Sequence, residues 1–185
     1  MNAPPERPSA RRAELLERAY AYVLEHGLTD LSLRPLATAV GSSPRVLLFL
    51  FDSKDELVAA LLRRARADEL AVLDDVRGGG RHDLPGAVRA VWGWLADPAH
   101  RPLLVLWTQA YARSLTDPLG PWAGFARATV EDWLTLLGES DPRCSEPGPT
   151  LALAVLRGAL LDLLATGEVE RATAAVEAWL GTKPS

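Results

Sequence analysis

Apolar residues recur at helical spacing along almost the whole chain, and this periodicity limits the fold more than any other feature of the sequence. Leu33, Leu36, Ala37 and Val40, for example, follow the i, i+3, i+4, i+7 pattern of a helix that buries one face. No stretch alternates apolar and polar residues for long enough to predict a strand, and the hairpin dipeptides Asn-Gly and Asp-Gly are absent. The sequence therefore predicts an all-α fold.

Turn and capping residues divide this pattern into nine predicted helices. Gly27 and Gly41 stand where the first two helices should end, while Ser32 and Ser43 precede helices as N-caps. The run Gly78-Gly79-Gly80 marks the clearest internal boundary. The helices are expected near residues 10–26, 33–40, 44–51, 54–77, 84–96, 100–115, 121–138, 150–166 and 168–181.

Composition excludes several classes of protein. With 48% hydrophobic and 24% charged residues, the 185-residue chain is typical of a globular domain. Its single cysteine, Cys144, rules out an intrachain disulfide and a thiolate metal cluster. The histidines, at 26, 82 and 100, lack metal-ligand spacing, so no metal or other cofactor is expected. The apolar stretch 150–165 is shorter than the roughly 20 residues of a membrane span, and no leader is evident. A cytoplasmic protein without a membrane partner is expected.

Charge is distributed unevenly. The net charge of −4 argues against indiscriminate binding to polyanions. Residues 7–12, however, contain three arginines and no acid, and residues 32–54 contain Arg34, Arg45 and Lys54 against Asp52 alone. A small basic surface near the N-terminus is therefore compatible with the negative net charge of the whole chain.

Residues 32–57 (SLRPLATAVGSSPRVLLFLFDSKDEL) hold the strongest motif. Two short helices joined by a turn of about three or four residues that begins with glycine have the spacing of a helix-turn-helix. Gly41 suits the turn because the chain must reverse there with positive φ. The second helix of such a pair enters the major groove with its N-terminal residues toward the bases. Those residues are Ser43, Pro44 and Arg45, and an arginine can bind guanine in a bidentate contact worth about 1–3 kcal/mol.

Residues 10–60, with this turn and the sequence FDSKDEL at 51–57, resemble the DNA-binding domain of the TetR family of bacterial repressors. The resemblance implies a flexible arm at 1–9, a helix-turn-helix domain at 10–55 with its motif at about 32–51, and a ligand-binding and dimerisation domain at 56–185. It also implies a homodimeric repressor that binds an inverted-repeat operator in double-stranded DNA. A small apolar or aromatic effector would release it.

Two positions depart from the family pattern. Leu48 replaces a tyrosine that usually holds a phosphate, and Leu50 replaces a histidine. If Leu47, Leu50 and Phe51 are buried, Leu48 and Phe49 face solvent and can contact thymine methyl groups. The residues expected to contact DNA are Arg11, Arg12, Ser32, Arg34, Ser43, Arg45, Leu48, Phe49 and Lys54. The alternative is a helical small-molecule-binding module that has lost DNA binding and acts through a protein partner.

The helix expected at 150–166 is apolar on all sides, so a single monomer core would leave part of it in water. A second copy of the chain can cover the remainder as a two-fold symmetric four-helix interface. The expected dimer residues are Leu153, Leu156, Leu160, Leu164, Val176 and Trp179. A central helix covered by its own chain is the alternative.

Aromatic and polar side chains recur on the inward faces of the middle helices. The resemblance implies an effector cavity there, and the expected lining is Trp92, Trp107, Thr108, Gln109, Tyr111, Phe125, Thr129 and Trp133. The alternative is that these residues are ordinary core. No combination of nucleophile, base and orienting group is visible, so no catalytic residue and no enzymatic activity are expected.

Overall fold

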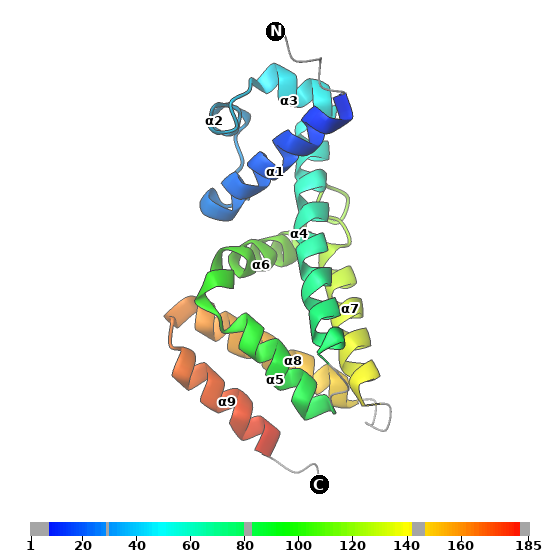
Figure 1. Ribbon diagram of the computed structural model, residues 1–185, viewed down its shortest axis with the longest axis vertical. Helices are drawn as coiled ribbons and strands as arrows, with labels where there is room; N and C mark the ends of the chain where they lie inside the picture. The colour runs from blue at the N-terminus through cyan, green and yellow to red at the C-terminus, as the bar shows by residue number, and fades with distance from the viewer. Residues whose placement is uncertain (1–7, 29, 80–82, 142–146, 182–185) are drawn as a thin grey trace. The chain divides into compact units, whose positions relative to one another are not determined.

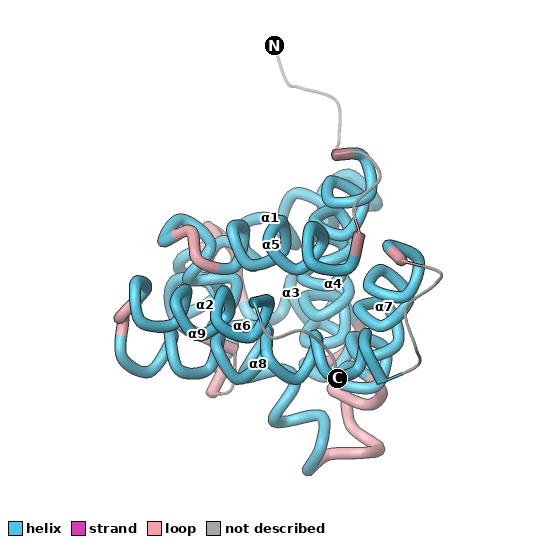
Figure 2. The backbone as a smooth tube through the Cα atoms, turned by 90° about the horizontal axis from the view of Figure 1, so that it is seen from below, coloured by secondary structure: helices cyan, strands magenta, loops and turns pink. Residues whose placement is uncertain are grey.

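The computed structural model describes residues 8–28, 30–79, 83–141 and 147–181. Within these ranges the chain forms nine α-helices, one short 3-10 helix and no strand, so the predicted all-α class is confirmed (Figures 1 and 2). The helices are α1 (Pro8–His26), α2 (Leu33–Ala39), α3 (Pro44–Phe51), α4 (Lys54–Gly78), α5 (Leu84–Leu95), η1 (Pro98–His100), α6 (Arg101–Thr116), α7 (Phe125–Ser140), α8 (Pro147–Thr166) and α9 (Val169–Gly181).

Local signals explain most helix ends. Gly27 and Gly41 adopt φ of +82° and +66°, the left-handed conformation that lets glycine end a helix. Two helix starts differ from the prediction by three or more residues. The seventh helix begins at Phe125 rather than near residue 121, because Gly124 has φ of +75° and interrupts the helix. The eighth begins at Pro147, since proline is tolerated in a first turn. Residues 1–7 of the predicted arm at 1–9, together with His82 and Cys144, lie outside the described residues, whereas Pro8 and Ser9 belong to α1.

The chain forms two compact units. The first comprises the described residues through Asp68 together with Val105–Ala126, and the second comprises Glu69–Leu104 with the described residues from Arg127. This division falls within α4, whereas the sequence placed a domain boundary at 55/56; that boundary remains a prediction.

In the first unit, α1, α2 and α3 pack around a small apolar core. Leu15 of α1, Leu36 of α2, and Leu47 and Phe51 of α3 are each at most 1% exposed. The same unit includes the first half of α4, whose Leu57 and Leu61 are equally buried. Burial of apolar surface contributes about 25 cal/mol per Å² to stability, and it is the main force that holds the short helices α2 and α3 in place.

In the second unit, α8 packs against α5 and α9. The Trp92 indole N–H of α5 donates to the Thr173 hydroxyl of α9 over 3.0 Å, and Arg89 pairs with Glu177 over 3.0 Å. The 20-residue α8 is long and apolar enough to cross a membrane by length and composition alone, a test that core helices of soluble proteins also pass. It is thus longer than the sequence predicted.

Candidate nucleic-acid interface

The segment α2–turn–α3 has the local geometry of a helix-turn-helix. Ser42 N–H donates to the Ala37 carbonyl over 2.8 Å, which closes the turn after the positive-φ Gly41. Ser43 caps α3, because its hydroxyl oxygen accepts the Val46 N–H over 3.3 Å, and Pro44 occupies the first turn. Ser32 precedes α2 but makes no side-chain cap, so its exposed hydroxyl is available to another group.

Two arginines of α1 bind the carboxyl ends of α2 and α3. Arg12 Nε donates to the Leu50 carbonyl over 3.1 Å, and its guanidinium lies 4.7 Å from the centroid of the Phe51 ring. Arg18 Nη1 donates to the Val40 carbonyl over 3.4 Å. Because neither α2 nor α3 has a basic residue in its last turn, these contacts supply the cations that a helix carboxyl end favours. Arg12, predicted to contact DNA, therefore has an intramolecular role, and sequence reasoning missed Arg18.

The basic residues predicted to contact DNA fall into two groups. Arg34, Arg45 and Lys54 are exposed, and none of their side chains makes an ion pair or hydrogen bond with another described residue. Arg11, by contrast, donates to Glu14 over 2.7 Å. That hydrogen bond, together with the charges of Arg11 and Arg18, lowers the pKa of the Glu14 carboxyl. The unpaired cations thus lie on α2, on α3 and at the start of α4.

The surface of α3 is largely apolar. Leu47 and Phe51 are buried, whereas Val46, Leu48 and Phe49 are 40%, 39% and 78% exposed. Leu50 is half-buried, so it does not join the core as fully as the sequence suggested. The predicted exposure of Leu48 and Phe49 is therefore observed, and α3 offers solvent an unusual amount of hydrocarbon.

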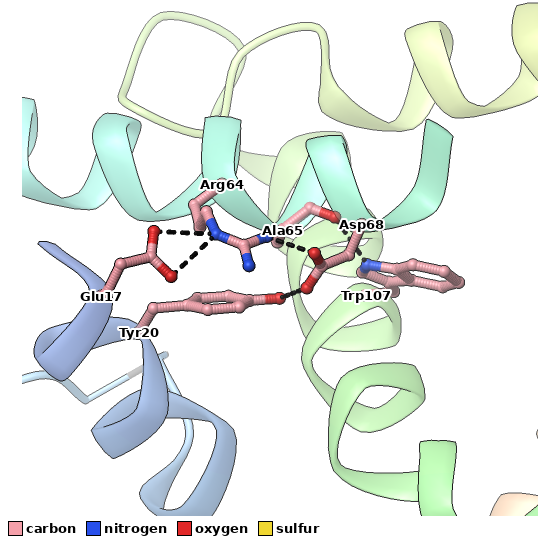
Figure 3. A network of polar contacts seen from close by, with 6 residues as sticks. All are labelled: Glu17, Tyr20, Arg64, Ala65, Asp68 and Trp107. Carbon is pink, nitrogen blue, oxygen red and sulfur yellow. Dashed lines mark hydrogen bonds and ion pairs between the residues drawn. The ribbon is translucent and has the colours of Figure 1, made fainter. Parts of the chain in front are cut away.

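A polar network joins α1 to the first half of α4 (Figure 3). The Tyr20 hydroxyl donates to Asp68 over 2.7 Å, while Arg64 bonds to both Asp68 and Glu17, the latter at 2.9 and 3.1 Å. Burial and the hydrogen bond to Asp68 raise the pKa of Tyr20, and the hydrogen bond to Asp68 raises the pKa of Arg64. Tyr20 therefore stays protonated and Arg64 charged, which keeps the network intact across physiological pH.

The residues predicted to line an effector cavity are held by contacts of their own. In the first unit, the Trp107 indole N–H donates to the Ala65 carbonyl over 3.2 Å, as Figure 3 shows. Gln109 Oε1 accepts the Leu28 N–H over 3.4 Å. Thr108 and Tyr111 are half-buried and Phe125 is buried, so the pocket assignment of the whole set remains a prediction.

In the second unit, the predicted cavity residues Thr129 and Trp133 meet on a carboxylate that sequence reasoning missed. The Trp133 indole N–H donates to Glu69 Oε1 over 2.6 Å, and the Thr129 hydroxyl to Glu69 Oε2 over 3.3 Å. Among the described residues Glu69 is the one buried charged residue, at 1% exposure. Buried charges require such partners, because an unpaired carboxylate in the interior is costly. No group of metal-ligating side chains occurs in the described part of the chain.

The predicted dimer residues are buried to different degrees. Leu153, Leu156 and Val176 are at most 6% exposed, so the chain itself already covers them. Leu160, Leu164 and Trp179 are half-buried, and Leu151 and Leu161 are 53% and 54% exposed. One face of α8 therefore lies against its own chain, and another leaves leucines in solvent.

No family model matches the sequence, and no curated protein matches it either. Solved structures do match the fold. A transcriptional regulator from Rhodococcus sp. Rha1 is 26% identical, with a TM-score of 0.76 over 92% of this chain and 94% of that one. A TetR transcription regulator from Haloarcula marismortui is 18% identical, with a TM-score of 0.69 over 92% and 94%. The described chain has the fold of the TetR family.

The resemblance that the sequence indicated is therefore confirmed. A further solved structure that matches this chain is the multidrug binding protein EbrR. Its complex with imidazole is 21% identical to this chain, with a TM-score of 0.69 over 95% of this chain and 93% of that one. Its complex with proflavin is 24% identical, with a TM-score of 0.61 over 91% and 96%.

Proposed function

We propose that this protein is a DNA-binding transcriptional regulator that works as a homodimeric repressor in the cytoplasm. The observation that carries the proposal is the set of unpaired, exposed cations Arg34, Arg45 and Lys54 on and beside a helix-turn-helix. Arg45 lies in the first turn of α3, where side chains reach base edges, and it is the candidate for a specific contact with guanine.

Lys54 is proposed to bind phosphate. It opens the 25-residue α4, whose first-turn amides and positive dipole end favour an anion, and its ammonium adds a full charge. Ser32, whose hydroxyl makes no capping hydrogen bond to α2, and Arg34 are proposed to bind the DNA backbone near the Lys54 contact. Such contacts position a protein on DNA without selecting sequence. Arg11 and Arg12 are now assigned a smaller share of the binding, because both side chains already have partners within α1 and α3.

A dimer follows from the two-fold symmetry of an inverted-repeat operator, whose half-sites lie about 34–36 Å apart. The leucines that α8 leaves in solvent, Leu151 and Leu161, support an interface built on α8 and α9. A second copy of the chain would remove them from water, with Leu160, Leu164 and Trp179 at the contact and the buried Leu153, Leu156 and Val176 beneath it.

A small apolar or aromatic effector is proposed to release the operator. EbrR, which has the same fold, is described as a multidrug binding protein and holds proflavin or imidazole. Here α4 is one continuous helix that begins at Lys54 and contributes residues to both compact units. A shift of α4 on effector binding would therefore move a phosphate contact. A coupling of about 1–3 kcal/mol would change operator affinity roughly five- to 150-fold.

The test is selection of duplexes from a random pool by the purified full-length chain, followed by anisotropy titration of wild type and variants. Arg45→Ala should relax base preference at one position in each half-site and cost about 1–3 kcal/mol there. Lys54→Ala should weaken every duplex alike. Arg127→Ala, at an exposed arginine of α7 paired with Glu131, is the matched control and should change nothing. Failure to enrich any duplex would overturn the proposal.

A second function is favoured by one observation. The apolar, solvent-facing α3 lacks the tyrosine that the family uses at position 48, which suits a protein that binds small molecules and acts through a protein partner. In that case proflavin-like ligands would bind while no duplex is enriched, so the same selection separates the two functions.

A further inference from the structure

Two exposed apolar side chains of α3 lie on the same face of the helix as Arg45, its one basic residue. Arg45, Leu48 and Phe49 stand at positions i, i+3 and i+4 of the helix, so their side chains share one face. Phe49 is the most exposed of the three α3 hydrophobic residues in solvent, at 78%. All six residues from 46 to 51 have hydrocarbon side chains, so beyond Arg45 this helix offers no polar side chain for hydrogen bonding.

The charges of the residues on either side of α3 indicate which kind of partner this face binds. Arg34 and Lys54, exposed and without partners among the described residues, flank α3 in the chain and favour a polyanion. The Ser43 hydroxyl oxygen already accepts the Val46 N–H. A helix that enters the major groove with this surface meets two kinds of group there, the hydrogen-bonding base edges and the C5-methyl group of thymine. Leucine and phenylalanine can stabilise a complex only through the second.

We propose that α3 recognises pyrimidine C5-methyl groups through Phe49 and Leu48, beside a guanine contact of Arg45. This inference rests on the proposed function and names the chemistry that the helix recognises. Each half-site then contains thymine next to the guanine, and 5-methylcytosine substitutes for that thymine because it presents the same methyl group. Recognition here comes from removal of methyl surface from water rather than from a hydrogen-bond pattern.

The experiment uses the full-length chain and a duplex that it selects from a random pool. Replacing the thymine next to the guanine by deoxyuridine removes one methyl group and nothing else. With about 0.8 kcal/mol per buried methyl-sized group, affinity should fall about fourfold for one half-site and about 15-fold for both. Replacing the thymine–adenine pair by cytosine–guanine should weaken binding, and 5-methylcytosine in the same place should restore most of the loss.

Phe49→Ala and Leu48→Ala complete the test. Because both side chains are exposed, at 78% and 39%, their removal leaves the core unchanged. Each single variant should lose part of the preference for thymine over deoxyuridine, and the variant with both substitutions should bind the two duplexes equally. Leu119→Ala, at a leucine 96% exposed outside the helix-turn-helix, is the control and should keep the full methyl dependence. Enrichment of a duplex whose affinity ignores deoxyuridine substitution overturns this inference while leaving DNA binding intact. Absence of any enriched duplex overturns both. If Phe49→Ala abolishes binding of a protein partner but not of DNA, the face belongs to that partner and the inference is wrong.

Discussion

Arg12 offers the sharpest test of how the recognition helix is held. Arg12→Met retains most of the side-chain length but removes the guanidinium that donates to the Leu50 carbonyl over 3.1 Å and lies 4.7 Å from the Phe51 ring centroid. A hydrogen bond from a charged group contributes about 1.5–3 kcal/mol, and a partly exposed cation–π contact adds about 0.5–1 kcal/mol. Since Arg12 is only half-buried, we take the lower values, and the free energy of unfolding should fall by about 2 kcal/mol.

The assay is urea unfolding of the full-length chain at one fixed protein concentration, followed by circular dichroism. Arg11→Met is the matched control, because Arg11 lies next to Arg12 and carries the same charge. Its ion pair is with half-buried Glu14 on the same helix, so its effect should stay below about 0.5 kcal/mol. The salt dependence of DNA binding should differ little between Arg12→Met and wild type, because the Arg12 guanidinium binds a carbonyl and has only a small share in the contact with DNA. Equal stabilities of the two variants, or a shallower salt dependence for Arg12→Met, would refute this reasoning.

Two further substitutions test the interior and the turn. Trp133→Phe removes the indole N–H that donates to buried Glu69 and should lower the free energy of unfolding by about 1.5–3 kcal/mol. Trp92→Phe, which loses a hydrogen bond to neutral Thr173, should cost about 1 kcal/mol less in the same thermal or urea unfolding. Equal losses would contradict a charged acceptor at Glu69. Gly41→Ala should cost about 1–2 kcal/mol because φ is +66°. Space is not the cause, since the added Cβ would lie 3.8 Å from its nearest neighbour, Arg18 Nη1. Gly138→Ala within α7, where an added Cβ would meet nothing within 4 Å outside the helix's own backbone, should instead stabilise by about 0.5–1 kcal/mol. The opposite order of the two glycine variants would show that φ does not decide the cost.

Features encoded by neighbouring residues were predictable from the sequence. Gly27 and Gly41 ended helices, and Ser43 with Pro44 began one, because these signals act within one turn of backbone. The exposed face of α3 also followed from a single periodicity argument. Gly124, in contrast, received no weight, and the seventh helix was placed about four residues too early.

Contacts between distant residues were not predictable. Arg12 meets a carbonyl 38 residues away, and Trp133 meets a carboxylate 64 residues away. Nothing local distinguishes Glu69 from the exposed acids of its helix, so its role appears only when α7 packs beside α4. For the same reason, the sequence assigned Arg12 to DNA, although the tertiary structure gives its guanidinium to the end of α3.

The most direct test of the central claim is the salt dependence of binding between the full-length chain and a duplex that it has selected. If about 6–8 phosphates are neutralised per dimer by Lys54, Arg34 and their neighbours, the logarithm of the affinity should fall against the logarithm of the salt concentration with a slope of about −5 to −7. The Lys54→Ala dimer should lose about 2 from the magnitude of that slope, one phosphate per protomer. An affinity that does not change with salt, or a slope that Lys54→Ala leaves untouched, would contradict the account.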